Sequence, residues 1–432
     1  MKRKKIAVIA VLVALFYVKV LHAQGTEAYE QPPINYSATQ PHDAISRLQA
    51  RLIAGDAKLN GNDREIVQTL LRELGVRAES QLLVFSKTSF QRSRIRPDQP
   101  RALYFSDTCY VGWVPGGLIE ITTIDPQLGP IFYSFDPEPK ERKFVRDSNC
   151  MTCHGGTFVR GIPGVFARSL FPSETGEPLL HHGSEVVDFR TAFTNRWGGW
   201  YVTGKHGAAL HRGNVLAHEK NDQLVVDLKR GANLTDLSRF FDTDAYLEHG
   251  SDIVALLIFE QQTAIQNTIT RASLECRRML EYQKALQRDL KEPVTEELTY
   301  DSVKRVFDGD AKDLVDDLLF KDEAELPAGL EGSPGFQKAF VADSRHAKDG
   351  NSLKDLDLKG KLFRNRCSYL IYSESFLALP QQLKQRVYAR LGQALHPKNP
   401  LPEYAYLGAD ERARITGILR KTHPEFAKAT SN

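Results

Sequence analysis

The feature that most constrains this chain is a five-residue stretch at positions 150–154, Cys-Met-Thr-Cys-His. Two thiols at this spacing, followed directly by an imidazole, are the attachment sequence for haem of the c type. The thiols add to the two vinyl groups of the porphyrin, and the histidine then reaches the iron from the proximal side. We therefore predict one covalent haem c held by Cys150 and Cys153, with His154 as an iron ligand.

Three other interpretations of the stretch are weaker. A redox-active dithiol requires a thioredoxin-like βαβ context, whereas the segment after His154 is rich in glycine and shows no clear helical pattern. A zinc site requires further ligands, and the sequence contains no second Cys-x-x-Cys and no His-x-x-x-His. A disulfide between Cys150 and Cys153 would close a tight loop and contribute little stability.

The N-terminus carries the pattern of a secretory signal peptide over residues 1–23. A basic stretch at 2–5 precedes an apolar run of about 13 residues, which is shorter than the ~20 that a transmembrane helix needs. Leu21 is large for the position three before a cut after Ala23, so an uncleaved membrane anchor is the alternative. We expect a periplasmic or secreted protein, which agrees with c-type haem because bacteria attach it outside the cytoplasm.

The positive charge of the chain is concentrated in the same segment. The whole sequence has a net charge of +3, but residues 1–23 hold five basic and no acidic side chains, which leaves 52 basic against 54 acidic ones. This balance argues against nucleic acid as a partner. We expect contact with a membrane only if the N-terminal segment is not cleaved and remains as an anchor.

The stretches that flank the motif resemble a group of large, exported, bacterial single-haem proteins within the cytochrome c superfamily. These stretches are Leu83–Ser89, Arg101–Phe105, Tyr110–Gly117, Arg196–Gly204 and Cys367–Ser373. They span most of the mature chain, whereas a compact class I cytochrome carries its motif near the start of about a hundred residues. The group has no settled activity, so the resemblance implies a role only for the haem motif.

Periodicity predicts an α+β fold with N-terminal helices, a small antiparallel sheet, an irregular haem-binding segment and a mostly helical C-terminal half. Helices are expected at 43–54, from 62 or 63 to 74, from 251 or 252 to before Pro293, around 383–395, and from a cap at Asp410. Strands are expected at 82–85, 101–105, 110–114, 118–124 and 130–135. The acidic run at 308–317 reads as a solvated helix face rather than a calcium loop, because its glycine is misplaced for an EF-hand.

These patterns divide the chain into five parts. They are the signal peptide at 1–23, a flexible leader at 24–41, helices plus sheet at 42–145, the haem-binding region at 146–292 and a helical region at 293–432.

A dense aromatic and glycine-rich segment in the haem-binding region is the expected wall of the haem pocket. Trp197 and Trp200 offer large faces for packing against the porphyrin, and Arg196 offers a charge for a propionate. The alternative is an ordinary glycine-rich turn with core aromatics.

The second axial ligand of the iron is predicted from the remaining histidines and methionines. His206 ranks first and His211 second, because they end the aromatic segment. Met279 is the only methionine candidate, and its place on a long helix favours packing. No catalytic residue can be named from spacing.

The function predicted from these features is electron transfer by one c-type haem outside the cytoplasm, with a redox protein or a small donor or acceptor as the partner. The alternatives are a haem enzyme, such as a peroxidase or another small-molecule oxidoreductase with an open distal site, and a haem-based redox or gas sensor. The other three cysteines, Cys109, Cys276 and Cys367, are expected to be mostly buried free thiols.

Overall fold

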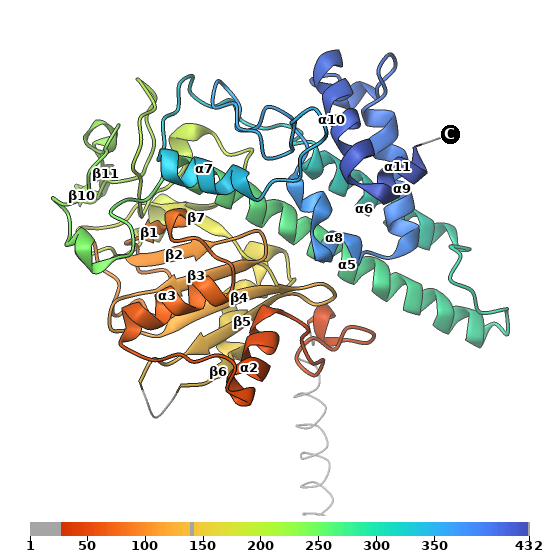
Figure 1. The fold of residues 1–432 in the computed structure, drawn as a ribbon, viewed down its shortest axis with the longest axis horizontal. Helices are drawn as coiled ribbons and strands as arrows, with labels where there is room; N and C mark the ends of the chain where they lie inside the picture. The colour runs from red at the N-terminus through yellow and green to blue at the C-terminus, as the bar shows by residue number, and fades with distance from the viewer. Residues whose placement is uncertain (1–26, 139–141, 431–432) are drawn as a thin grey trace, which may run out of the picture.

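The computed structural model describes residues 27–138 and 142–430 (Figure 1). The predicted signal peptide lies outside these residues. The predicted flexible leader is wrong for its described part: Ile34 and Tyr36 are buried, and the Tyr36 hydroxyl donates to the Pro130 carbonyl at 2.6 Å. Both side chains pack into the hydrophobic core beside the sheet, which composition alone did not indicate.

Two capped helices follow, as predicted. Helix α2 spans Ala44–Ala54 and α3 spans Asp63–Glu73. Each begins with a capping box, since the Asp43 side chain accepts from the Ser46 amide at 2.8 Å and Asn62 accepts from the Glu65 amide at 3.0 Å. Their apolar stripes face the sheet.

The sheet has seven antiparallel strands in the order β6-β5-β4-β3-β2-β1-β9. The five predicted strands are present within one or two residues: β1 Leu82–Val84, β2 Arg101–Phe105, β3 Cys109–Trp113, β4 Ile119–Asp125 and β5 Gly129–Phe135. The edges are β6 Phe144–Arg146 and β9 Trp200–Tyr201, and neither was predicted.

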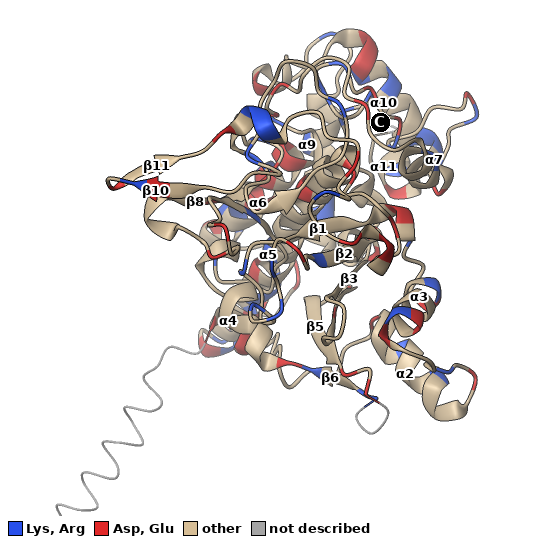
Figure 2. Ribbon diagram, turned by 90° about the vertical axis from the view of Figure 1, so that its left-hand side faces the viewer, with Lys and Arg blue, Asp and Glu red and all other residues tan. Residues whose placement is uncertain are grey.

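The sheet forms the middle of three layers. Leu83, Tyr104 and Tyr133 belong to the core on the side of α2 and α3, whereas Leu103 and Phe132 belong to the core on the opposite side. Alternation along a strand sends neighbouring side chains to opposite faces, so both faces are covered. In Figure 2, α2 and α3 lie on one side of the sheet and α4 (Met151–His154) and α5 (Ile253–Asp289) lie on the other.

Helix α5 runs across the molecule, and its C-terminal end projects beyond the sheet (Figure 1). It begins as predicted at the Asp252 cap, whose side chain accepts from the Val254 and Ala255 amides at 2.9 and 2.8 Å. Its first half is buried almost all round because the sheet and the C-terminal helices enclose it. No helix in residues 27–138 and 142–430 is long and apolar enough to cross a bilayer.

The C-terminal region is helical, as predicted. Its helices are α6 Asp301–Leu318, α7 Pro334–Ala342, α8 Glu374–Leu377, α9 Gln381–Ala394, α10 Ala409–Thr422 and α11 Pro424–Ala429. The N-cap of α10 is Gly408, so Asp410 lies in the first turn and not at the cap.

The segment between the motif and α5 is irregular, as expected, with two small hairpins. Strands β7 Ala167–Leu170 and β8 Ser184–Val187 form one, and β10 His218–Lys220 and β11 Gln223–Val225 form the other. This region is not a separate unit, because β9 pairs with β1 of the N-terminal sheet through Leu83 and Tyr201.

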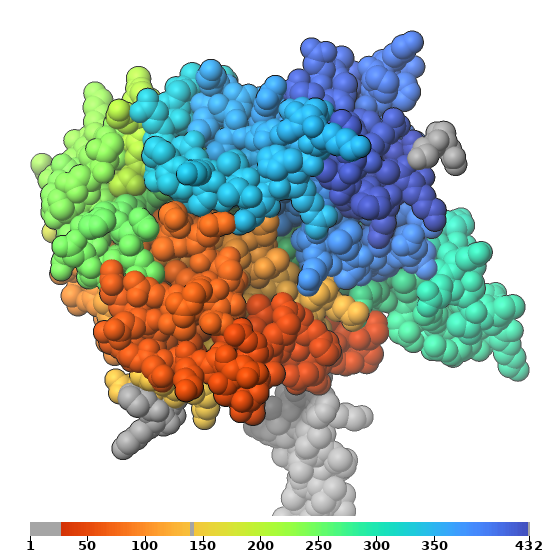
Figure 3. Space-filling model, viewed as in Figure 1, coloured from red at the N-terminus to blue at the C-terminus, as the bar shows by residue number. Residues whose placement is uncertain are grey.

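The N- and C-terminal parts are also in contact. The Lys354 ammonium lies 2.8 Å from an Asp107 oxygen and Arg77 lies 2.8 Å from Asp343. Figure 3 shows the segment that contains α7 packed directly against the N-terminal part of the molecule.

Candidate functional site

The predicted attachment residues lie together on one helical turn. Residues 148–150 form a 3₁₀ turn that leads into α4, and the Asp147 side chain accepts from the Asn149 amide at 2.9 Å. Cys150 and Cys153 are three positions apart, so they share one side of the turn. Both are free thiols, Cys150 half-buried and Cys153 exposed. Burial raises the pKa of Cys150 to about 12, with smaller contributions from neighbouring charges.

The imidazole of His154 is held in one orientation. Its Nδ1 lies 2.8 Å from the Gly164 carbonyl, and the Gly164 amide donates back to the His154 carbonyl at 2.8 Å. A carbonyl can only accept, so Nδ1 carries the proton and Nε2 keeps its lone pair. Burial, with a small addition from the Arg101 charge, lowers the pKa of His154 to about 4 against the raising effect of the Gly164 carbonyl. The ring is neutral at physiological pH, as a metal ligand has to be.

Two aromatic rings pack against this imidazole. The Phe132 ring centroid is 4.7 Å from that of His154, and the Phe166 centroid is 5.1 Å away. Phe132 comes from β5 and Phe166 from the segment just before β7. The sheet and the loop after the motif therefore both pack against the His154 ring.

Helix α5 fixes the end of that loop. The Asn267 side chain accepts from the Val165 amide at 3.0 Å and donates to the Val165 carbonyl at 2.7 Å. A Cβ at Gly164 would lie 2.8 Å from Asn267 Oδ1 and from Val159, so only glycine fits there without displacing its neighbours. Asn267 thus positions Gly164, and Gly164 positions His154.

Arg101 beside the motif was not predicted as a site residue. Its guanidinium lies 2.6 Å from Glu120 across the sheet, and both side chains are largely buried. The intervening residue is Gly112, where a Cβ would come within 2.2 Å of the guanidinium. The Arg101 charge also lowers the pKa of both His154 and Cys150. Two features of the sequence could have indicated this arginine. A charged residue begins an otherwise apolar strand, and a glycine lies inside the next strand.

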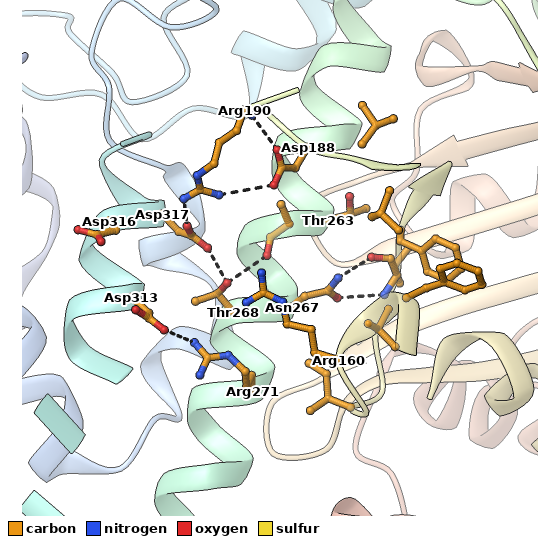
Figure 4. A pocket seen from close by; sticks show the side chains of 18 residues that line it. Arg160, Asp188, Arg190, Thr263, Asn267, Thr268, Arg271, Asp313, Asp316 and Asp317 are labelled. Carbon is orange, nitrogen blue, oxygen red and sulfur yellow. Dashed lines mark hydrogen bonds and ion pairs between the residues drawn. The ribbon is translucent and has the colours of Figure 1, made fainter. Parts of the chain in front are cut away.

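A cavity of about 330 Å³ adjoins the loop that follows the motif (Figure 4). Phe158 and Phe166 line it on the loop side. On the other side, the Thr268 hydroxyl of α5 donates to Asp317 at 2.5 Å, and Asp317 also pairs with Arg190. The loop after the motif thus contributes two phenylalanines and Arg160 to the cavity, and the side toward α6 is charged.

The acidic run at 308–317 is a solvated helix face only in part, because Asp308 and Asp313 are exposed. Asp310 and Asp317 are buried on α6, and Arg271 of α5 lies 2.8 Å from Asp310 and 2.9 Å from Asp313. Burial without such partners would cost several kcal/mol per charge, so these ion pairs are what allow the acids to face α5. Sequence spacing did not reveal them because the arginines belong to distant segments.

The Arg196 guanidinium is not available to bind a haem propionate. It is buried in an ion pair with Glu260 of α5 at 2.6 Å. Its remaining donors bond the carbonyls of Thr191 at 2.9 Å and Phe189 at 3.2 Å. The expectation that Arg196 meets a haem propionate is therefore corrected: its guanidinium joins a loop to the central helix.

The two predicted tryptophans have different surroundings. Trp197 is buried against Phe193 and His211, with ring centroids 5.1 and 5.0 Å apart. Trp200 donates from Nε1 to the Arg168 carbonyl at 2.7 Å, and the Arg168 guanidinium lies within electrostatic range of Cys153. Of the two, Trp200 has the direct bond to the segment beside the motif.

His206, the predicted second axial ligand, is not next to His154. Its Nε2 lies 3.1 Å from Nε2 of His211 and accepts from the Asn233 amide at 2.9 Å, so the two buried histidines bond each other. Their loop is joined to the start of α5, where the Ile253 amide donates to the Thr203 carbonyl at 3.0 Å. Fourteen residues of helix, about 21 Å, separate that point from Asn267 beside the motif.

Met279 is also distant from the motif. It follows Asn267 by twelve residues on α5, about 18 Å along the axis, and it packs against the main core. The two histidines predicted for the second axial position therefore lie elsewhere, and Met279, for which packing was favoured, is a packing residue.

No protein-family model, curated protein or solved structure matches this chain. The resemblance to exported single-haem proteins therefore stays an expectation. The function has to be inferred from the residues themselves.

Proposed function

We propose that this protein is a c-type cytochrome that carries one covalent haem and transfers electrons outside the cytoplasm. The observation that carries the proposal is the fixed His154 imidazole beside two free thiols on one helical turn. Its Nδ1 bonds the Gly164 carbonyl at 2.8 Å, which leaves Nε2 as the nitrogen that can bind iron.

The residues fit a thioether-linked haem in their chemistry. Cys150 and Cys153 supply the two thiols, and both are free of disulfides. His154 is neutral and oriented, and Phe132 and Phe166 supply apolar contacts around it. When bound, the haem supplies reversible one-electron redox chemistry.

The chain's own contribution is to orient His154 and to set the charge around it. Arg101 brings a positive charge to the motif, and Glu120 partly compensates it at 2.6 Å. Charge and burial near a haem tune its reduction potential. A redox protein or a small donor or acceptor would then exchange the electron. The near-neutral charge outside residues 1–23 favours neither nucleic acid nor an anionic surface as a partner.

Peptide mapping tests the proposal directly. We expect the full chain, made in a bacterial host competent in c-type haem maturation, to carry haem mass on the peptide that contains Cys150 and Cys153. Cys153→Ala should abolish normal two-point attachment, whereas Cys367→Ala, the matched control, should retain it. Recovery of both motif thiols in free form from such a host would contradict the proposal.

A haem enzyme with an open distal site is the second candidate, and one observation favours it. His206, His211 and Met279 all lie away from His154, and a cavity of about 330 Å³ adjoins the loop after the motif. A ligand-accessible iron would suit a peroxidase, another small-molecule oxidoreductase or a gas sensor. The spectrum of the ferric protein separates the candidates: a low-spin iron that does not bind cyanide supports the electron carrier, and a high-spin iron that binds cyanide supports the open site.

A further inference from the structure

Two histidines and a glutamate converge on the surface, away from the motif cysteines. His181 and His182 end a 3₁₀ turn at 180–182, and Glu219 lies in β10 of a separate hairpin. The Nε2 atoms of the two histidines lie 2.5 and 2.9 Å from the same oxygen, Oε1 of Glu219. The imidazole centroids are 4.2 Å apart. Within residues 27–138 and 142–430, this is the one cluster of three such side chains with ligand atoms so close together.

We propose that His181, His182 and Glu219 bind a divalent first-row transition-metal ion, with Zn²⁺ as the type ion. Two imidazole nitrogens and one carboxylate are the donor set that such ions prefer, whereas Mg²⁺ and Ca²⁺ prefer oxygen alone. Three protein ligands leave a fourth position of a tetrahedral ion to water or another molecule. This ion is separate from a haem iron and does not depend on the proposed haem.

The geometry requires only a small adjustment. Ligand atoms around a tetrahedral zinc ion with bonds of 2.0–2.1 Å lie about 3.3 Å apart, and the two N···O separations here are 2.5 and 2.9 Å. His181 and Glu219 have 61% and 41% of their side-chain surface exposed. Exposed side chains can move apart by several tenths of an ångström without disturbing a core.

The placement of the ligands gives the ion a structural consequence. The hairpin of β10 and β11 extends from the body of the molecule (Figure 2), and its strands are largely exposed. The turn with His181 and His182 leads directly into β8, which pairs with β7. A bound ion would therefore fasten the hairpin to the β7–β8 hairpin, because metal-binding free energy also stabilises the conformation that binds.

Titration of the untagged full chain, as purified, with Zn²⁺ by calorimetry tests the site. We expect saturable binding by the wild type, with at least a tenfold loss of affinity in His182→Gln and in Glu219→Gln. The matched control is His218→Gln, which lies on the same hairpin one residue from Glu219 and therefore points to the other face of the strand. It should bind Zn²⁺ like the wild type.

Two further measurements make the outcome decisive. A crystal soaked with Zn²⁺ should give an anomalous peak within about 2.0–2.2 Å of the two Nε2 atoms and a Glu219 oxygen, and a tenfold excess of Mg²⁺ should not displace the ion. Equal affinity in wild type and both ligand variants, or a zinc peak elsewhere on the chain and none at these three residues, would overturn the proposal. Far-UV circular dichroism of each variant verifies that the fold is retained, since the His182 side chain is 17% exposed and that of Glu219 is 41% exposed.

Discussion

At the scale of single residues, the Arg101 guanidinium is a positive charge that acts on both Cys150 and His154 of the motif. It crosses the sheet over Gly112 to reach Glu120, and it lowers the pKa of His154. A positive charge beside a haem favours the reduced iron, which carries one positive charge less. Arg101 is therefore expected to tune the reduction potential of the proposed haem.

Removing this charge should lower the reduction potential of the proposed haem. We expect Arg101→Gln to shift the potential down by roughly 40 mV, which corresponds to about 1 kcal/mol for one electron. Arg101→Gln combined with Glu120→Gln removes both charges and should return the potential toward the wild-type value. Spectroelectrochemistry measures both, and an unchanged potential in the single variant would show that the guanidinium does not act on the haem.

The buried pair of His206 and His211 has a different consequence, which concerns pH. Burial, with the neighbouring His206 as the smaller cause, lowers the pKa of His211 to about 3, from an ordinary value near 6.5. Between these values the unfolded chain binds the proton more readily than the folded chain. The free energy of unfolding is therefore undiminished above pH 6.5 and decreases as the pH falls toward 3.

Urea unfolding at pH 7, 6 and 5 measures this dependence. We expect His211 to contribute a loss of up to about 1.4 kcal/mol per pH unit below 6.5. His211→Gln should be less stable at pH 7 but show a shallower decrease with falling pH. Parallel curves for wild type and variant would contradict the assignment of this dependence to His211.

At the scale of elements, α5 contacts the segments that surround the candidate site. Its Asn267 holds Val165, its Glu260 holds Arg196, and its Arg271 holds the carboxylates of α6. Each partner belongs to a different segment. One helix therefore holds the loop after the motif, the aromatic segment that begins at Arg196, and α6 of the C-terminal region. The length of α5 also separates the His206 loop from the motif.

Replacing Asn267 should disturb His154 without touching it. We expect Asn267→Leu to cost about 1–3 kcal/mol, because the buried amide and carbonyl of Val165 lose their partners. The loop should loosen at Gly164, and the optical and redox properties of the haem should change although attachment is retained. Glu275→Gln is the control, at a half-exposed position on the same helix that lies 3.6 Å from Arg271. Identical spectra for wild type and Asn267→Leu would contradict the positioning role.

At the scale of the whole molecule, the described parts behave structurally as one body. The sheet takes β9 from the region expected to be separate, and two ion pairs connect the N-terminal part to the segment at 343–354. The three cysteines outside the motif lie in three different parts of the molecule. Cys109 lies in β3, Cys276 in α5 and Cys367 near the C-terminal helices, and all three are fully buried free cysteines, as predicted.

Thiol labelling along a urea gradient therefore reports on cooperativity. We expect no labelling of Cys109, Cys276 or Cys367 in the native protein and labelling of all three at the same midpoint, because each becomes accessible only in the common unfolding step. Mass spectrometry of the digested protein assigns the sites. Labelling of Cys367 at a lower urea concentration than Cys109 would show that the C-terminal region unfolds independently.

The sequence by itself determined the features that depend on near neighbours along the chain. The Cys-x-x-Cys-His spacing, the five central strands and the caps at Asp43, Asn62 and Asp252 are set by residues a few positions apart, and periodicity exposes them. The motif residues therefore stayed the candidate site, and the capped helices were found where they were expected.

Only the tertiary structure decided which distant groups meet. Arg196 was assigned to a propionate but pairs with Glu260, and His206 was assigned to the iron but bonds His211. Arg101 reaches the motif across the sheet, although nothing within its own strand indicates that neighbour. A buried charged side chain or imidazole needs a hydrogen-bond or ion-pair partner, and any element that packs beside it can supply one. The partner is therefore decided by the packing of the layers and not by spacing in the chain.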